Sequence, residues 1–316
     1  MVDLPLVSII TPSYNQARFL ESTLRSVLEQ DYPNIEYLVV DGASMDGSLE
    51  IIRGYEDRLA WWVSEKDSSQ TEALNKGLRK ARGEFVGWLN SDDLYLPGAV
   101  SAAVAAFHSN PSAAVVYGDA LAIDADGRSI NLMRARQYSL VDLIAFEIIC
   151  QPAAFMRRSA LEKVDYLDPA YSHLLMDNLL WMKMAHLAPL VYVPQTWAAA
   201  RYHELAKNRT HAAAFGSEAR ALIGDLKTRP EFADLIVAHE KRIMAGVNRF
   251  DAFYLTDAGQ GLGALRAYAR AFRLHPRTAL GDWKHILLAF FTLLGLQKIR
   301  ALYDHFRVRR YEPPVN

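Results

Sequence analysis

Short apolar runs alternate with amphipathic stretches through the first third of the chain. The compact apolar runs predict strands at residues 6–11, 35–40, 59–63, 84–89 and 115–117. Apolar positions three or four residues apart predict helices between them, at residues 15–28, 47–55 and 71–81. An Asp126-Gly127 pair follows another apolar run, and this dipeptide is typical of a hairpin turn. The pattern therefore predicts strands that alternate with helices.

Alternating apolar strands and amphipathic helices are typical of a mostly parallel sheet covered by helices on both faces. In such sheets ligands bind beyond the carboxyl ends of the strands. Polar residues gather at those ends in four segments, which are 13–15, 41–46, 67–70 and 90–93. An α/β fold of this Rossmann-like kind, with a ligand site at that edge, is therefore expected.

The pattern changes to helices alone from about residue 212. Residues 251–276 predict one helical hairpin, and no second copy of it is found, so a repeat array is not expected. We therefore expect an α/β domain over residues 1–210 and a helical C-terminal region over residues 211–316.

Composition narrows the class of protein. The chain has 316 residues, of which 51% are hydrophobic and 22% charged, as in ordinary globular proteins. Its 35 Lys and Arg residues nearly balance 36 Asp and Glu residues, so charge gives no support for nucleic-acid binding. Cys150 is the single cysteine, which excludes an intramolecular disulfide and a cysteine zinc cage.

No targeting or spanning segment is expected. The first five residues lack a basic and apolar signal pattern. The longest apolar run, Ile286–Leu296, is too short for a bilayer, which needs roughly 20 apolar residues. The next residues are basic, so residues 283–310 could lie in the headgroup layer of an anionic membrane or pack on the protein itself. The basic residues are Lys298, Arg300, Arg307, Arg309 and Arg310, and the acidic Asp304 lies between them in the sequence.

Asp92 and Asp93 are the strongest candidates for chemistry. They follow a buried strand, and two adjacent carboxylates repel each other unless a cation lies beside them. One interpretation is a helix cap with a neighbouring surface acid. The other is a magnesium or manganese site that holds a diphosphate, because these cations prefer carboxylate oxygens.

Other polar residues allow structural and functional interpretations. Asn15 and Asp46 are each expected to cap a following helix. Asp41 ends a strand and precedes a glycine, and it is either a turn residue or a binding residue. Asp67 and Gln70 flank a short serine loop and mean little in isolation.

Asp177 and His203 stand later in the chain. Asp177 opens an apolar helical segment, where it caps the helix, activates an acceptor hydroxyl as general base, or does both. His203 follows an arginine and a tyrosine, and it is either a structural residue or a ligand to metal or phosphate.

Taken together, these segments resemble the inverting family 2 glycosyltransferases of the GT-A fold. The resemblance covers about residues 5–208. Its main motifs are Val7–Asn15, Val39–Ser48, Ser64–Gly77 and Gly87–Asp93. Its later motifs are Gln151-Pro152, Arg157-Arg158, Met176–Trp181 and Arg201–His203. Ser69 and Glu72 depart from the glycine and aspartate of many relatives, which puts fine donor contacts at this loop in doubt.

The resemblance implies a role for each matched position. The nucleotide base would lie against Asp41 and the loop Pro12, Ser13, Tyr14 and Asn15, with Tyr14 as a stacking surface. Asp67 and Gln70 would line the donor pocket. Asp92 would contact the ribose or share the metal, Asp93 would bind Mn²⁺ or Mg²⁺, and His203 would support the metal or diphosphate. Asp177 would be the general base of a direct, inverting displacement.

The resemblance also implies substrates and a place of action. It favours a UDP-sugar donor, with dTDP- and GDP-sugars open, and a glycan or lipid-linked acceptor of surface-polysaccharide synthesis. A cytoplasmic enzyme, peripheral at the inner face of the cell membrane, is expected. The rival functions are nucleotidyl transfer, which usually needs a glycine-rich phosphate loop that Pro12–Asn15 lacks, and non-catalytic sugar binding or scaffolding.

Overall fold

A computed structural model describes residues 4–171, 174–204 and 206–296. The chain divides into two compact units. The first comprises Met1–Ile123, Leu132–Gln137 and Ile149–Arg201. The second comprises Asp124–Asn131, Tyr138–Ile148 and Tyr202–Asn316. The division expected near residue 210 stays a prediction about domains.

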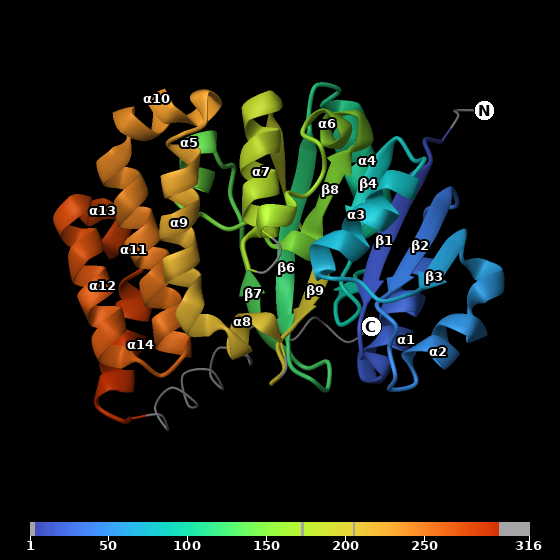
Figure 1. The fold of residues 1–316 in the computed structure, drawn as a ribbon, viewed down its shortest axis with the longest axis horizontal. Helices are drawn as coiled ribbons and strands as arrows, with labels where there is room; N and C mark the ends of the chain where they lie inside the picture. Colours follow the sequence, from blue (N-terminus) through green and yellow to red (C-terminus); the bar gives the residue numbers. More distant parts are fainter. Residues whose placement is uncertain (1–3, 172–173, 205, 297–316) are drawn as a thin grey trace. The chain divides into compact units, whose positions relative to one another are not determined.

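The first unit is built on a nine-stranded mixed sheet, whose order is β3-β2-β1-β4-β8-β6-β9-β5, with β7 paired to β6 (Figure 1). Strands β3, β2, β1 and β4 are parallel, as are β6 and β9, whereas β8 is antiparallel to both its neighbours and β5 to β9. The strands are β1 (Val7–Ser13), β2 (Ile35–Asp41), β3 (Trp61–Ser64), β4 (Phe85–Trp88), β5 (Leu94–Tyr95), β6 (Val115–Ile123), β7 (Ser129–Met133), β8 (Ala154–Arg157) and β9 (Leu190–Arg201).

Helices cover both faces of this sheet, as the sequence pattern predicts. The helices that alternate with strands are α1 (Ala17–Leu28), α2 (Ser48–Gly54), α3 (Gln70–Lys80), α4 (Ala99–Ser109), α6 (Arg158–Lys163) and α7 (Met176–Leu187). Short 3₁₀ turns lie at η1 (Glu56–Arg58), η2 (Gln151–Ala153) and η3 (Pro169–Tyr171).

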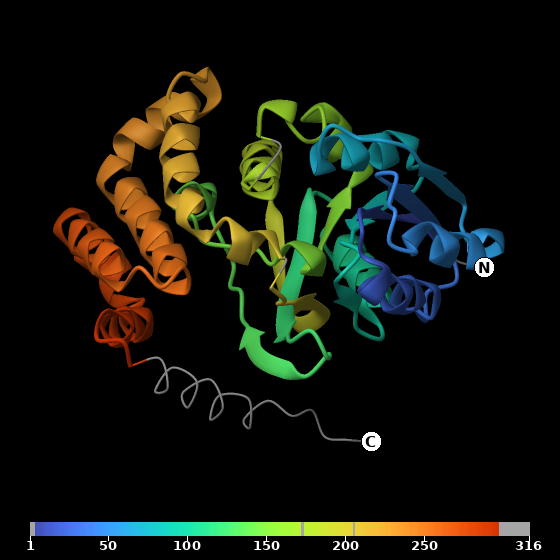
Figure 2. The same ribbon diagram turned by 60° about the horizontal axis from the view of Figure 1, so that its bottom comes forward.

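Side-chain alternation along β1 explains the two covered faces. Val7 and Ile9 belong to the buried cluster that includes the apolar face of α1. Ile10 points the other way, and its side chain would lie 2.6 Å from a Cβ at Gly77, so α3 packs closely on the opposite face. Figure 2 shows α1 and α3 on opposite sides of these strands.

The second unit is helical from residue 212 onward within the described residues. The predicted helical hairpin is confirmed as α11 (Glu240–Asp257) and α12 (Gly261–Leu274), which pack with α14 (Trp283–Leu293) around small residues such as Ala252, Ala264 and Ala289. The turn at Asp126-Gly127 is also confirmed, because Gly127 has a φ of 83° and donates its amide to the Asp124 carbonyl at 3.0 Å, while the Asp124 amide donates to the Arg128 carbonyl at 2.9 Å. The elements are α5 (Leu140–Ile144), α8 (Lys207–Thr210), η4 (Ala212–Ala214), α9 (Phe215–Leu226), α10 (Pro230–Ala238), α11 (Glu240–Asp257), α12 (Gly261–Leu274), α13 (Pro276–Leu280) and α14 (Trp283–Leu293).

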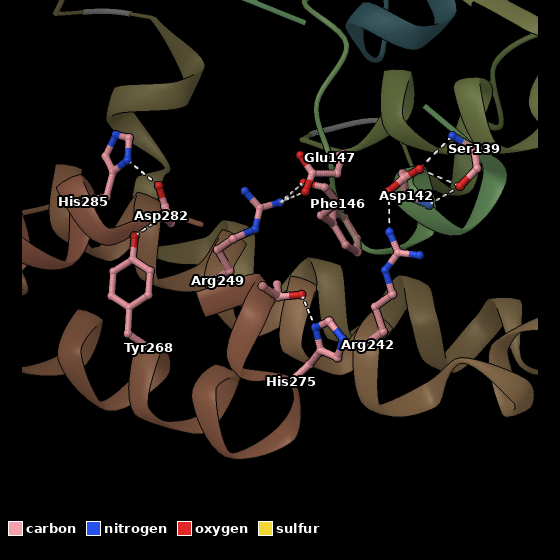
Figure 3. Close-up of polar contacts among 11 residues, drawn as sticks. Ser139, Asp142, Phe146, Glu147, Arg242, Arg249, Tyr268, His275, Asp282 and His285 are labelled. Carbon is pink, nitrogen blue, oxygen red and sulfur yellow. Dashed lines mark hydrogen bonds and ion pairs between the residues drawn. The ribbon is translucent and has the colours of Figure 1, made fainter. Parts of the chain in front are cut away.

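Polar contacts hold the helices of this unit together (Figure 3). Arg242 of α11 donates to Asp142 of α5, whose carboxylate also closes a capping box with Ser139. Asp282, just before α14, accepts from the Tyr268 hydroxyl at 2.7 Å and contacts the His285 ring. These contacts fix α5 and the start of α14 within the unit.

Two expected helix caps are wrong. Helix α1 begins at Ala17, and Asn15 instead accepts from the Met45 amide at 2.9 Å while its own backbone φ is 50°. Gly47, with a φ of 100°, takes the cap position of α2. Asp46 lies one residue earlier, where its carboxylate accepts from Ser48 and also from Ala17 at the start of α1. Both side chains therefore join the segment after β1 to the loop before α2, about 30 residues apart in the sequence, a contact that local sequence does not encode.

Candidate active site

The polar ends of the parallel strands meet at one edge of the sheet. Ser13 pairs in register with Asp41, and Asp41 pairs with Ser64, so β1, β2 and β3 end side by side. Asn90 to Asp93 follow the end of the adjacent strand β4. The edge that the sequence predicts as a ligand site is thus formed by consecutive strand ends.

Asp41 is fully buried at this edge, and its carboxylate has several donors. The hydroxyl of Ser64 donates to it at 2.6 Å, while Ser44 donates through its amide at 2.9 Å and its hydroxyl at 2.5 Å. Hydrogen bonds to a carboxylate compensate for the loss of water on burial. Asp41 therefore braces the loop after β2, and its contact with a nucleotide base stays a prediction.

The loop after β1 leaves one aromatic ring open to solvent. Pro12 and Ser13 are buried, and the Ser13 hydroxyl has no hydrogen-bond partner among the described residues. Tyr14 is 66% exposed. A Cβ added at Gly42 would lie 3.2 Å from the Tyr14 ring, so that ring lies directly beside the backbone after Asp41. This arrangement suits stacking of a base on Tyr14, the role that the resemblance implies.

Asp67 lies at the opposite side of β2, in the loop after β3. One carboxylate oxygen accepts from Lys76 at 2.7 Å, and the other is buried without a partner among the described residues. Burial raises the pKa of Asp67, an effect that Lys76 opposes. An unsatisfied buried oxygen carries a free-energy cost, which a ligand donor such as a sugar hydroxyl would remove.

The two departures from the family pattern have a structural role. The Ser69 side chain accepts from the Glu72 amide at 3.2 Å and caps α3. The Glu72 carboxylate accepts in turn from the amide and hydroxyl of Ser68. These contacts fix the start of α3, where Gln70 is the first residue and donates to Asn90 at 2.9 Å.

Asp93 is buried in the turn after β4, beside the half-buried Asp92. Its carboxylate accepts from the Arg201 amide at 2.8 Å, and its carbonyl accepts from the Thr23 hydroxyl at 2.8 Å. Burial, and then the neighbouring charge of Asp92, raise the pKa of Asp93 well above its usual range. This environment disfavours two negative charges, and a bound cation would reverse that penalty.

The carboxylate pair fits a divalent cation that also binds phosphate. Among the residues the structure describes, no three His, Cys, Asp or Glu side chains form a metal-binding group. Magnesium and manganese sites often use one or two carboxylates, with substrate phosphates and water as the other ligands. Asp92 and Asp93 supply that donor set.

Asp177 is the second residue of α7, so the expectation that it caps this helix is wrong. Leu175 holds the cap position, and no side chain caps the helix there. Burial raises the pKa of Asp177 to about 6, although backbone N–H groups at the helix start oppose the shift. The charges of Asp93 and Asp177 both act on the Cys150 thiol and, after burial, raise its pKa. Both carboxylates therefore lie near the same buried residue.

Helix α7 is placed at this edge by its contact with α3. The Thr71 hydroxyl lies 3.2 Å from the sulfur of Met176, next to Asp177. The start of α3, which carries Gln70, thus lies beside the start of α7. His203 is buried and belongs to the second unit, so its predicted role toward the metal or diphosphate stays a prediction.

Sequence reasoning missed Asn90 as a site residue. Its side-chain oxygen accepts from the Trp88 indole and from Gln70, and its nitrogen donates to Gln151 and to Asp93. The available signal was its place in the strand-end motif before the two aspartates, but a motif does not tell which way an amide points.

The chain is similar to known proteins in sequence and in fold. The sequence model described as "Glycosyl transferase family 2" matches residues 8–165. The chain belongs to this family. It is therefore a glycosyltransferase, as the combined motifs predict.

Relatives by sequence include named and uncharacterized glycosyltransferases. The putative teichuronic acid biosynthesis glycosyltransferase TuaG of Bacillus subtilis is 44% identical over 92 residues, which are 28% of this chain and 36% of the relative. The match thus spans about a third of the length of TuaG. An uncharacterized glycosyltransferase of Mycobacterium tuberculosis is 28% identical over 245 residues, covering 76% of this chain and 90% of the relative.

Solved structures share the fold. Residues 1–349 of S. aureus TarS, in complex with UDP-GlcNAc, align with a TM-score of 0.62 at 19% identity, covering 92% of each chain. The mannosyltransferase PcManGT from Pyrobaculum calidifontis, in complex with GDP-Man and Mn²⁺, aligns with a TM-score of 0.60 at 22% identity. That alignment covers 92% of this chain and 88% of PcManGT. The GT-A fold with a C-terminal helical region is confirmed.

Proposed function

We propose that this glycosyltransferase moves a sugar from a nucleotide-sugar donor, most simply a UDP-sugar, to a glycan or lipid-linked hydroxyl in surface-polysaccharide synthesis. The observation that carries the proposal is the strand edge, where Asp92 adjoins the buried Asp93 and where Asp93 and the general-base candidate Asp177 both lie near Cys150. The UDP-GlcNAc bound in the TarS structure supports the donor class, and the similarity to TuaG, a putative teichuronic acid biosynthesis glycosyltransferase, supports the acceptor class.

The chemistry follows from the roles of these residues. The Asp177 carboxylate accepts the proton of the acceptor hydroxyl as that oxygen bonds to the anomeric carbon. The bond from that carbon to the diphosphate breaks on the opposite face, so the configuration inverts and a nucleoside diphosphate leaves. Asp93, with Asp92, would hold Mn²⁺ or Mg²⁺, which when bound neutralises charge on the departing diphosphate. Tyr14 and Asp41 would hold the base.

Donor binding tests the first half of the proposal. The purified chain should be stabilised by one of UDP, GDP or dTDP in the presence of Mn²⁺, and not by the matching nucleoside. A nucleotide at 100 times its Kd stabilises a protein by about 2.7 kcal/mol, so the melting temperature should rise by several degrees. If none of the three diphosphates shifts the melting temperature, the nucleotide-sugar assignment is wrong.

Activity should depend on pH through Asp177. Its pKa of about 6 is raised, so its proton is retained to a higher pH than in an ordinary aspartate. The base is the deprotonated form, and kcat/KM should therefore fall about tenfold per unit as pH decreases below about 6. A pH profile measures this fall. The Asp177→Asn variant should lack it, and an unchanged profile in that variant would remove Asp177 from the mechanism.

We also propose contact with an anionic lipid surface through α14. Four apolar side chains spaced four, three and four residues apart, three on one face of this helix and the fourth at its C-cap, are each at least 45% exposed. They are Trp283, Leu287, Phe290 and Leu294. No helix among the described residues meets the length and hydropathy needed to cross a bilayer. The basic residues expected to support this contact, Lys298 to Arg310, lie outside the described residues.

Vesicle co-sedimentation tests this contact. The full chain should pellet with anionic phosphatidylglycerol vesicles at low salt, and a Trp283→Ser/Phe290→Ser variant should bind several-fold less, because membrane binding scales with buried apolar area. Val237→Ser is the matched control, since Val237 is 71% exposed on α10. Equal pelleting of all three proteins would exclude α14, and no pelleting of the unaltered chain would exclude the peripheral assignment.

A further inference from the structure

A chain of hydrogen bonds joins Gln70 at the start of α3, the Asp93 carboxylate and Gln151 of η2. Asn90 is at its centre, between the end of β4 and Asp93. Its side-chain oxygen accepts from the Trp88 indole at 2.8 Å and from Gln70 at 2.9 Å. Its nitrogen donates to Gln151 at 3.1 Å and, over a longer 3.4 Å, to Asp93.

Trp88 fixes the direction of this chain. An indole N–H donates and cannot accept, so the atom of Asn90 that faces Trp88 must be oxygen. The Asn90 nitrogen must then face Asp93 and Gln151. Trp88 is 1% exposed at the end of β4, so water cannot easily replace this bond.

Gln151 follows the same rule. Because the Asn90 nitrogen donates to it, Gln151 presents its oxygen there, and its own nitrogen donates to the Trp88 carbonyl at 2.6 Å. Gln151 is 9% exposed. The indole and carbonyl of one tryptophan thus set the orientation of two side-chain amides, the half-buried Asn90 and the buried Gln151, and each amide has one arrangement that satisfies all its partners.

We propose that Asn90 is a positioning residue, which orients the Asp93 carboxylate for a divalent cation, and that Trp88 sets the direction in which Asn90 points. This inference rests on the proposed metal role of Asp93. Hydrogen-bond donors behind a metal-binding carboxylate fix its orientation, and losing such a partner typically costs about 10–100-fold in metal affinity or activity. The bond from Gln70 also connects this carboxylate with the donor side of the site.

The affinity for Mn²⁺ alone can be measured independently of turnover. Mn²⁺ is titrated into the full chain, and binding is followed by electron paramagnetic resonance. Asn90→Ala should raise the Mn²⁺ Kd about 10–100-fold. Asn90→Asp keeps the shape and the acceptor for Trp88 and Gln70 but lacks the N–H that faces Asp93, so it should also weaken Mn²⁺ binding although its added negative charge by itself would strengthen it. Unchanged Mn²⁺ affinity in Asn90→Ala, or tighter binding in Asn90→Asp, would overturn the proposal.

Trp88→Phe isolates the orienting bond. It should weaken Mn²⁺ binding in the unaltered background and add nothing in the Asn90→Ala background, because the two changes break the same connection. Trp197→Phe is the matched control, since the buried Trp197 indole donates only within its own strand region, to Gln195 at 3.3 Å. Equal Mn²⁺ affinity in Trp88→Phe and Trp197→Phe would overturn the proposal, whereas an unaltered chain that binds no Mn²⁺ would overturn the metal assignment itself.

Discussion

Replacing Asp93 with alanine should abolish sugar transfer while leaving the fold intact. Its carboxylate is buried beside Asp92, and these two effects raise its pKa despite the opposing contacts from Arg201 and Asn90, so a bound cation would favour the ionised form. The expected loss exceeds the about 10²–10³-fold that removing one electrostatic contact costs, because the diphosphate loses its counter-charge. Initial rates with Mn²⁺, together with circular dichroism, measure both parts.

Asp93→Asn is the matched variant for this prediction. It keeps an acceptor for the Arg201 amide, a bond that alanine breaks and whose loss costs about 1–3 kcal/mol. The asparagine variant should be equally inactive and more stable than the alanine variant. EDTA should abolish the sugar-transfer activity of the unaltered chain, and added Mn²⁺ or Mg²⁺ should restore that activity. Full activity in chelator would show that Asp93 binds no essential metal.

Replacing Asp177 with asparagine should lower kcat by about 10²-fold or more while donor binding stays nearly unchanged, because general-base catalysis contributes about 10²–10⁴-fold. Asparagine keeps the shape at the second position of α7 but cannot accept the acceptor's proton. Steady-state kinetics with the identified donor separate kcat from KM. Asp165→Asn is the control, since the Asp165 side chain is 84% exposed in the same unit.

Stability distinguishes this role from a structural one. The raised pKa of Asp177 means that the folded state binds its proton more tightly than the unfolded chain does. Stability from this group is therefore present at low pH and is lost as pH rises from the unfolded value toward about 6. The asparagine variant should thus be no less stable at pH 7. A lower melting temperature with unchanged kcat would make Asp177 a purely structural residue.

The first strands and helices could be predicted because local pattern determines them. Val7 and Ile9 face one layer and Ile10 the other, so the strand has apolar side chains on both faces and is easily recognised. The later strand β9 gives no such signal. It contains Pro194 and Gln195 where its register with β6 shifts, and a proline within a run usually argues against a strand.

The site residues could be predicted by type and position, but their connections could not. A strand-end motif indicates Asp93, yet its carboxylate accepts from the amide of Arg201, which is 108 residues away in the sequence. The orientation of Asn90 depends on the Trp88 indole and on Gln151, 61 residues later. Such contacts arise from tertiary packing, which hydrophobic periodicity does not encode. The same reason explains why Asn15 and Asp46 join loops instead of capping helices.

The most direct test of the account is product analysis after incubation of the unaltered chain with Mn²⁺ and a panel of UDP-, GDP- and dTDP-sugars. We expect one donor to be consumed with release of its nucleoside diphosphate, and no release from the Asp93→Ala variant. Release of a nucleoside monophosphate or pyrophosphate would instead indicate nucleotidyl transfer. The account would be contradicted if a donor bound but no donor of the panel were turned over with either glycan or lipid-linked acceptors. That result would favour a non-catalytic sugar-binding role.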